Sequence, residues 1–212
     1  MKNPISVSIN ASKAATERAI MRQVLAIDPS LTSTGVCWGS DPHDWEVMVC
    51  KSKPLGKNVA ERVRRYEGLF SQINQICMTS QPVMIFIEAY AYGANTGSQM
   101  YLGEFGGILR WHLDYHSKHI YEVAPSTLKK FVTGKGNAKK EHMLAHVYHQ
   151  WGRLFDTSDE ADAFGLYQMA LCAAGRSTPT NKAQRESVAK VLEQNPITAR
   201  DLEVACNSTD PV

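Results

Sequence analysis

Residues 25–39 read LAIDPSLTSTGVCWG, in which an apolar run ends at an aspartate and a second apolar run follows a short polar turn. The two apolar runs predict two strands that pack on a core. Asp-Pro-Ser is common turn chemistry, so Asp28 taken alone is explained equally by a turn and by a ligand held at a strand end. The rest of the chain decides between these interpretations.

Further strands and helices follow this stretch. Strands are predicted at 22–28, 36–40 and 45–51, in a succession that suggests an antiparallel meander. An amphipathic helix is predicted over 58–78, and the continuous apolar run at 82–90 predicts a strand covered on both faces.

The second half of the chain alternates in the same way. A helix is expected over 108–119 and a short strand at 119–125. Helix-entry residues open the stretch 125–134, and helices are expected at 138–152 and 158–175. The order β-β-β-α-β-α-β-α-α predicts an α/β fold, with a five-stranded mixed sheet and helices on both faces.

Length and composition predict one globular domain with tails. The chain has 212 residues, of which 43% are hydrophobic and 21% are charged. We assign 1–21 to an N-terminal extension, 22–175 to the folded domain, and 176–212 to a polar C-terminal tail with a helix around 183–194.

Charge is distributed unevenly although the net charge is only +2. Residues 51–65 hold six basic residues and one acid, and residues 126–140 hold five lysines and no acid. Each segment is explained equally by a solvated face and by a surface that binds a polyanion.

Cysteine usage and hydropathy indicate the compartment. Five widely spaced cysteines without a CxxC pair argue against a disulfide framework or a zinc ribbon, and favour a reducing compartment. No apolar run approaches the roughly 20 residues of a membrane span, and the first residues lack the apolar region of a signal peptide. We therefore expect a cytoplasmic protein without membrane contact.

Four acids occupy positions where core building alone would not place them. Asp28 follows the first strand, Glu88 ends the apolar run VMIFIE, and Asp159 and Asp162 share one face of a helix start. A turn explains Asp28, and a strand-end surface explains Glu88, as well as a metal site does. The helix dipole explains Asp159 better than a metal site does. Asp162 is harder to explain because its face of the helix becomes apolar, and buried like charges require protonation or a cation such as Mg²⁺ or Mn²⁺.

Two other patterns carry less weight. Six histidines recur at i, i+4 and i+7 on two helices, but no cysteine or acid completes a zinc site, and a solvated helix face explains them: His112, His116, His119, His142, His146 and His149. The GKG at 134–136 lacks the Walker pattern, so no nucleotide cofactor is expected.

Four blocks in order resemble the RuvC family of Holliday junction resolvases, in the ribonuclease H-like superfamily, over residues 24–175. The blocks are IDPSLTSTG at 27–35, IEAYAYGANTGSQMYLGEFGG at 87–107, APSTLKKFVTGKGNAKKEHM at 124–143 and DEADAFGLYQMA at 159–170. Any single block is weak, but four at these spacings are specific.

The resemblance implies a ribonuclease H-like fold and a metal-dependent endodeoxyribonuclease. Asp28, Glu88, Asp159 and Asp162 would hold two Mg²⁺ ions, which Mn²⁺ can replace, and Lys140 would act near the scissile phosphate. The reaction would leave 5′-phosphate and 3′-hydroxyl ends, through paired nicks that a homodimer places across a four-way DNA junction. The expected DNA contacts are Lys129, Lys130, Lys135, Lys139, Lys140, Tyr90, Tyr92, Arg64 and Arg65.

This chain departs from the family pattern at two positions. Ser30 replaces a glycine of the opening turn, and Ala91 replaces an aromatic residue that stacks at the junction. Tyr90 or Tyr92 would substitute for that ring, although strand-end packing explains both tyrosines equally. The added ends lie outside the resemblance, as in phage-encoded relatives, for which the location would be the host cytoplasm.

Three competing functions remain at this point. A branched-DNA endonuclease of relaxed specificity would cut Y-junctions, flaps and replication forks. An actin-like or sugar-kinase ATPase shares the hydrophobic-Asp-x-x-x-T-x-x-G turn, but that architecture has two lobes and needs a longer chain. A non-catalytic DNA-binding protein would have lost its metal ligands, whereas all four acids are present here.

Overall fold

The computed structural model describes residues 23–54, 56, 58–90, 97–117 and 119–195. The strands are β1 (Val24–Asp28), β2 (Ser33–Gly39), β3 (Trp45–Lys51), β4 (Met84–Glu88) and β5 (Ile120–Val123). The helices are α2 (Val59–Ser80), α3 (Gly97–Leu113), α4 (Pro125–Thr133), α5 (Lys140–Trp151), α6 (Ser158–Ala173) and α7 (Lys182–Gln194). The predicted N-terminal extension, 1–21, lies outside the described residues.

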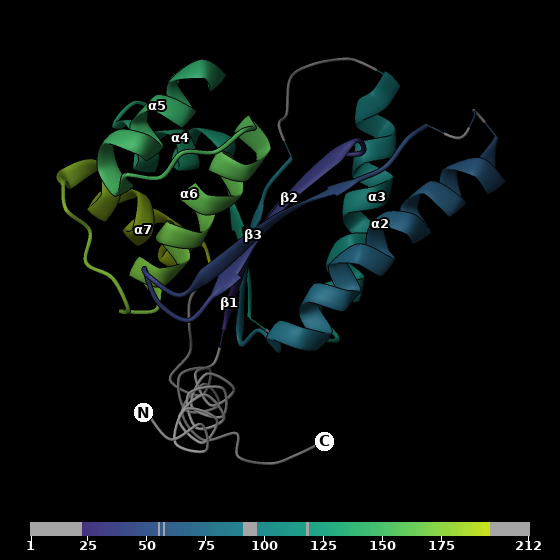
Figure 1. Cartoon of the computed structure of the whole chain (residues 1–212), viewed down its shortest axis with the longest axis horizontal. Coiled ribbons are helices and arrows are strands. Elements are labelled where there is room, and N and C mark those ends of the chain that lie inside the picture. The colour runs from purple at the N-terminus through teal and green to yellow at the C-terminus, as the bar shows by residue number, and fades with distance from the viewer. Residues whose placement is uncertain (1–22, 55, 57, 91–96, 118, 196–212) are drawn as a thin grey trace, which may run out of the picture.

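The strands form one mixed sheet in the order β3-β2-β1-β4-β5, which confirms the predicted α/β fold (Figure 1). The pairs β1–β2 and β2–β3 are antiparallel, and the pairs β1–β4 and β4–β5 are parallel. The second strand starts at Ser33 rather than at the predicted residue 36, because Ser33 already pairs with Lys51 of β3.

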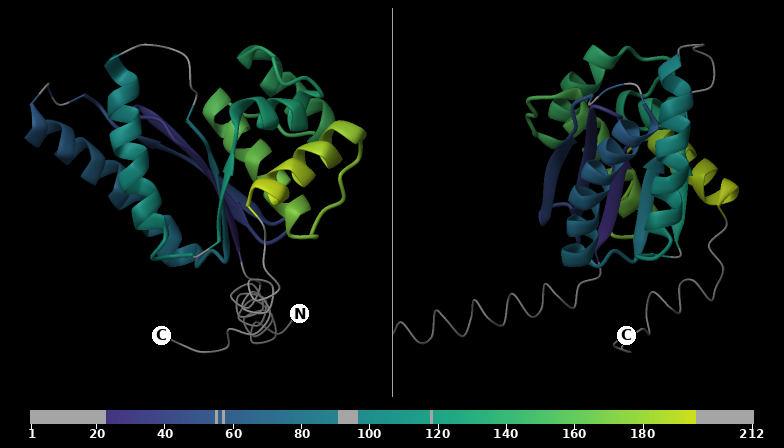
Figure 2. Two further views of the ribbon diagram at one scale, coloured as in Figure 1. Left: turned by 180° about the vertical axis from the view of Figure 1, so that it is seen from behind. Right: turned by 90° about the vertical axis from the view of Figure 1, so that its right-hand side faces the viewer.

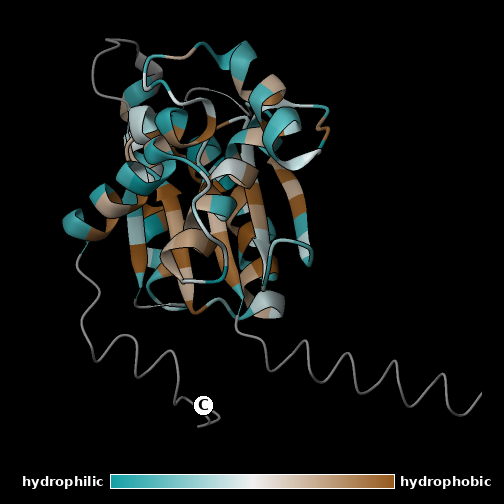
Figure 3. Ribbon diagram, turned by 90° about the vertical axis from the view of Figure 1, so that its left-hand side faces the viewer, coloured by the Kyte–Doolittle hydropathy of each residue, from teal (hydrophilic) through white to brown (hydrophobic). Residues whose placement is uncertain are grey.

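Helices cover both faces of the sheet, with α2 and α3 on one side and α4, α5, α6 and α7 on the other (Figure 2). The central strand β1 supplies both cores by alternation. Its Val24 and Ala26 side chains join the cluster under α6, and its Leu25 and Ile27 side chains join the cluster under α2 and α3. The strands are accordingly the most hydrophobic part of the fold (Figure 3).

The C-terminal helix α7 lies within the segment that the sequence assigns to a polar tail. It packs against α4, and its Val188 and Val191 side chains are buried in the same cluster as α4 and α6. Gln184 of α7 donates to Gln150 Oε1 over 2.7 Å, and Gln150 donates to the Val132 carbonyl at the end of α4. This part of the predicted tail therefore contributes to the core and connects α4 with α5.

Across the described residues, none of the helices combines the length and the apolar character that spanning a bilayer requires.

A glycine on β2 allows the first turn of α6 to contact the sheet. A Cβ atom on Gly35 would lie only 2.2 Å from the Asp159 carbonyl oxygen. We therefore expect Gly35→Ala to lower the free energy of unfolding by about 1–3 kcal/mol, because the helix must move outward. Denaturant unfolding measures this change.

Gly68 on the exposed face of α2 is the matched control, because nothing lies within 4 Å of a Cβ built there. Gly68→Ala should stabilise the helix by roughly 0.5–1 kcal/mol. If Gly35→Ala unfolds with the free energy of the unmodified protein, the close contact between α6 and β2 is absent from the protein.

Candidate active site

The carboxyl ends of β1 and β4 bring Asp28 and Glu88 to one edge of the sheet. The two strands are parallel neighbours, with Ile27 opposite Ile87, so the residue after each isoleucine lies at the same level. Each acid is the last residue of its strand. The carboxyl end of adjacent parallel strands is a common place for active-site residues, because the chain leaves the sheet there.

Helix α6 adds the other two acids from its N-terminus. The helix begins at Ser158, and the residue before it, Thr157, is the N-cap and forms a capping box with Glu160. Asp159 lies in the first turn of α6 and Asp162 three residues later, and α6 packs on β1 and β2. The structure thus brings together the four acids that the sequence singles out.

Burial and mutual repulsion raise the pKa of three of these carboxyls. The pKa of Asp28 lies well above its usual range, first because of burial and then because of Glu88 and Asp162. Burial, followed by repulsion from Asp162, raises the pKa of Glu88 to about 7. Burial also raises the pKa of Asp162 to about 6, although Lys140 opposes the rise. Such a group of buried acids is stable when a proton or a cation neutralises it.

Asp159 differs from the other three because it has hydrogen-bond donors. Burial would raise its pKa, but hydrogen bonds from Ser33 and Lys140 lower it overall. The Ser33 hydroxyl donates to Oδ2 over 2.5 Å, and the Lys140 ammonium donates to Oδ1 over 3.0 Å. Asp159 is therefore an anion at neutral pH in this arrangement.

Lys140 is the basic residue nearest to the acids. It is the first residue of α5, and its Nζ lies 3.0 Å from Asp159 Oδ1 and 3.9 Å from Asp162 Oδ2. Its side chain is 55% exposed, so it reaches the acids from the solvent side. Lys129 of α4 contributes at longer range, because its charge lowers the pKa of Glu88 and Asp162.

The other basic residues expected to contact DNA are not gathered at the acids. Lys130 pairs with Glu186 of α7 over 2.6 Å, whereas Lys135 and Lys139 are exposed between α4 and α5. On α2, Arg64 is exposed, whereas Arg65 turns inward and bonds to the protein itself.

Tyr90, expected to stack on DNA, packs against α3. Its hydroxyl donates to the Gly103 carbonyl over 3.2 Å, and the Arg110 guanidinium lies 4.4 Å from its ring centroid. A Cβ on Gly106 would collide with the ring, so the glycine makes room for it. Tyr92 and Ala91 lie outside the described residues.

Ser30 closes the turn after Asp28 with its own hydroxyl, where the family pattern has glycine. Its Oγ accepts from the backbone N–H groups of Thr32 and Ser33 over 3.3 and 3.4 Å. Thr34 bonds back to the Ser30 backbone from the other side. Within the described chain, Gln81 alone among non-glycine residues has a positive φ, so the serine fits this turn without strain.

Two residues that support the acids carry no signal in the sequence. Ser33 binds Asp159, as described, and Arg110 binds the Glu88 carbonyl oxygen through Nη2 over 3.2 Å. Arg110 also pairs with Glu122 of β5. A serine at a strand start and an arginine on a helix are both common. Neither stands out in the sequence, because the residues that they bind lie far away in the chain.

The donor chemistry of the site fits a hard divalent cation. Among the described residues of 23–195, no three His, Cys, Asp or Glu side chains lie close enough together to hold a metal ion in this conformation. Lys140 instead forms ion pairs with two of the acids, Asp159 and Asp162. However, Asp162 Oδ1 is buried without a hydrogen-bond partner. An unpartnered carboxylate oxygen beside two further buried carboxyls is a suitable ligand set for Mg²⁺ or Mn²⁺.

His112 of α3 and His116 of the turn that follows it are explained by packing. Their Nε2 atoms lie 3.2 and 3.0 Å from the Asn74 Oδ1 atom of α2, so they tie the two helices together.

Comparison with known proteins places this geometry in context. Residues 24–172 match the family model described as "Crossover junction endodeoxyribonuclease RuvC". The RuvC protein of Rickettsia typhi (strain ATCC VR-144 / Wilmington) is 28% identical over 152 residues, which cover 70% of this chain and 96% of that protein.

Solved structures agree in fold. Thermus thermophilus RuvC has a TM-score of 0.54 and 19% identity, with 74% of this chain and 99% of that chain covered. A second structure, of T. thermophilus RuvC in complex with a Holliday junction substrate, has the same TM-score of 0.54 over 69% of this chain and 90% of that chain.

Proposed function

Because the chain belongs to the RuvC family of crossover junction endodeoxyribonucleases, we propose that it resolves four-way DNA junctions by metal-dependent hydrolysis. Paired nicks would leave 5′-phosphate and 3′-hydroxyl ends. The observation that carries the proposal is the cluster of four acids at the carboxyl ends of β1 and β4 and the start of α6. Family membership and the chemistry of this cluster point to the same reaction.

Asp28, Glu88, Asp159 and Asp162 would hold two Mg²⁺ ions, with Mn²⁺ able to replace them. When bound, such ions activate a water molecule and stabilise the leaving oxygen of a phosphodiester. The raised pKa values of Asp28, Glu88 and Asp162 support this role, because a cation relieves the repulsion between these acids.

Lys140 would bind an oxygen of the scissile phosphate. Its ammonium group is partly exposed yet lies 3.0 Å from an acid of the site, so it can contact substrate without leaving the cluster. Lys129 would contact the DNA backbone next to it, and Lys135 and Lys139 would extend the basic surface along the loop between α4 and α5. Neutralisation of several phosphates predicts strong salt dependence of binding.

A nuclease of relaxed structure specificity is the second candidate. It is favoured by the Tyr90 ring, which is packed against α3 and bonded to Gly103, and by Ala91 in place of an aromatic residue. A Tyr90 ring held against α3 is less able to stack on the bases of an open junction.

Cleavage of synthetic four-way, three-way, flap and linear DNA separates the two candidates. The assay uses purified full-length protein with Mg²⁺, with Mn²⁺ or with chelator. Symmetric nicks confined to the four-way junction support the resolvase, and equal cutting of all branched substrates supports the relaxed nuclease. Binding without cleavage in either metal would contradict both, and cutting that persists in chelator would contradict the metal mechanism.

The exposed face of α3 would join two copies of the chain. Ile108 and Trp111 lie three residues apart on α3 and are 40% and 64% exposed. Tyr115, in the turn after the helix, is 69% exposed, and its ring centroid lies 5.1 Å from that of Trp111, so the three side chains form one stripe. Two nicks placed symmetrically require two active sites, and a two-fold dimer supplies them by using the same surface twice. A second copy is therefore the occupant that this stripe suits.

We expect Trp111→Glu to convert a dimer into a monomer, because large aromatic residues dominate the binding energy of such interfaces. Analytical ultracentrifugation of the full-length variant measures the change. Tyr148→Glu is the control, since Tyr148 is also exposed, at 48%, but lies on α5. A Trp111→Glu protein that remains dimeric would exclude this stripe as the interface.

A further inference from the structure

Arg65 of α2 is bonded to the loop that follows Asp28. Its Nη2 donates to the Leu31 carbonyl oxygen over 2.5 Å, and its Nε donates to the Ser52 hydroxyl over 2.9 Å. The Ser52 hydroxyl donates to the same Leu31 carbonyl, and the Ser52 backbone N–H donates to the Thr32 carbonyl over 3.1 Å. One guanidinium thus ties the turn to α2 and to the residue that follows β3.

The turn held in this way connects two of the acids. It begins directly after Asp28 and ends at Ser33, whose hydroxyl donates to Asp159 over 2.5 Å. A displacement of the turn would therefore move the end of β1 and the hydrogen bond that orients Asp159. Only four residues separate Asp28 from Ser33, so little of such a displacement can be absorbed between them.

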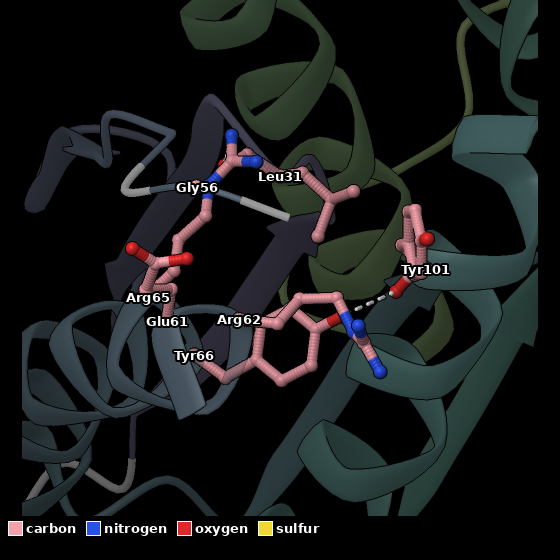
Figure 4. Close-up of a pocket in the computed structure, with 7 residues that line it drawn as sticks. All are labelled: Leu31, Gly56, Glu61, Arg62, Arg65, Tyr66 and Tyr101. Carbon is pink, nitrogen blue, oxygen red and sulfur yellow. Dashed lines mark hydrogen bonds between the residues drawn. The ribbon is translucent and has the colours of Figure 1, made fainter. Parts of the chain in front are cut away.

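Arg65 differs from an arginine that is free to bind DNA. It is half-buried, and Figure 4 shows it reaching from α2 toward Leu31 along the wall of a pocket about 130 Å³ in volume. Arg62, on the same wall, is paired with Glu104 over 3.0 Å. Arg64, by contrast, points outward and is exposed. Two adjacent arginines of equal charge therefore occupy different environments.

We propose that Arg65 is a positioning residue for the carboxylate cluster, which it supports by clamping the turn at residues 29–32 together with Ser52. The role in catalysis rests on the proposed nuclease function. The guanidinium fork is required, because it binds two acceptors at once in a fixed geometry, which a lysine ammonium on a flexible stem does not reproduce.

The test compares Arg65→Gln, Arg65→Lys and Arg64→Gln in the full-length protein. Three quantities are measured: the single-turnover cleavage rate at saturating four-way junction, the junction Kd in chelator, and Mn²⁺ affinity by calorimetry without DNA. Arg65→Gln should lower the rate and the Mn²⁺ affinity by about 10- to 100-fold, as for other residues that orient metal ligands. The junction Kd should not change.

Two comparisons separate positioning from DNA contact. Arg65→Lys keeps the charge but should not restore the rate, whereas Arg64→Gln should weaken junction binding without lowering the rate at saturation. The proposal is overturned if Arg65→Gln weakens only junction binding and lysine restores it, because the guanidinium would then act as a phosphate contact.

Ser52→Ala keeps the proposal testable if the arginine variants do not fold. Loss of this hydroxyl should lower the cleavage rate and the Mn²⁺ affinity, as Arg65→Gln does. An unchanged rate and an unchanged Mn²⁺ affinity would contradict the proposed clamp. If the unmodified protein binds Mn²⁺ but cuts no branched DNA, the proposed function fails on its own. The Mn²⁺ affinities of the variants then still decide whether Arg65 positions the carboxylates.

Discussion

Asp162→Asn should abolish cleavage of a four-way junction while leaving junction binding intact. The carboxylate is buried, its Oδ1 has no partner, and its pKa is raised to about 6, all of which suit a group that a cation neutralises. Asparagine keeps the shape but supplies no charge. Mutation of a residue that only orients a metal ligand typically lowers metal affinity or activity by about 10- to 100-fold. Loss of a ligand itself should therefore lower the cleavage rate by about 10³-fold or more.

The measurement is the single-turnover rate with enzyme in excess and saturating Mg²⁺, alongside junction binding in chelator. Asp156→Asn is the matched control, because Asp156 is exposed and lies just before the start of α6. The control should cut at the normal rate. A rate for Asp162→Asn within tenfold of the unmodified protein would remove Asp162 from the catalytic set.

Glu88→Gln should stabilise the metal-free protein at pH 8. Burial, then the charge of Asp162, raises the pKa of Glu88 from 4.5 to about 7, so the folded state holds this proton more tightly than the unfolded state does. A rise of this size corresponds to about 3 kcal/mol, as an upper figure because the neighbouring acids share it. The unmodified protein therefore loses stability as the pH rises from about 4.5 to 7, and glutamine removes that loss.

Thermal unfolding in chelator at pH 5 and pH 8 measures the effect. At pH 8, Glu88→Gln should raise Tm by roughly 5–10 °C for a chain of this size, and the gain should shrink at pH 5. Glu46→Gln, an exposed acid on β3, is the control and should change Tm at neither pH. Mg²⁺ should reduce the difference in Tm between Glu88→Gln and the unmodified protein, because it stabilises only the unmodified protein, which has the full ligand set.

Much of the fold could be predicted because apolar periodicity and turn residues follow directly from local sequence. The run VMIFIE marked β4 and its terminal acid, and Asp162 stood out because its neighbours are alanine and phenylalanine. The sequence does not specify which strands are neighbours, and it is the parallel pairing of β1 with β4 in the structure that brings Asp28 and Glu88 together.

The remaining features depend on contacts between distant segments. Lys130 belongs to a run of lysines, yet its partner Glu186 lies 56 residues further along, on a helix that reads as part of a polar tail. Arg65 looks like Arg64 in sequence, and its turn inward depends on a backbone carbonyl, which leaves no trace in the residue types. Gly35 matters because of the Asp159 backbone that it meets.

Anomalous diffraction from crystals soaked in Mn²⁺, recorded at the manganese absorption edge, tests most directly whether the four acids form a metal centre. We expect strong peaks within coordination distance of Asp28, Glu88, Asp159 and Asp162, and their loss in Asp162→Asn crystals. If crystals soaked in saturating Mn²⁺ show no peak at these carboxylates and Lys140 is still paired with Asp159, the proposed metal centre would be contradicted.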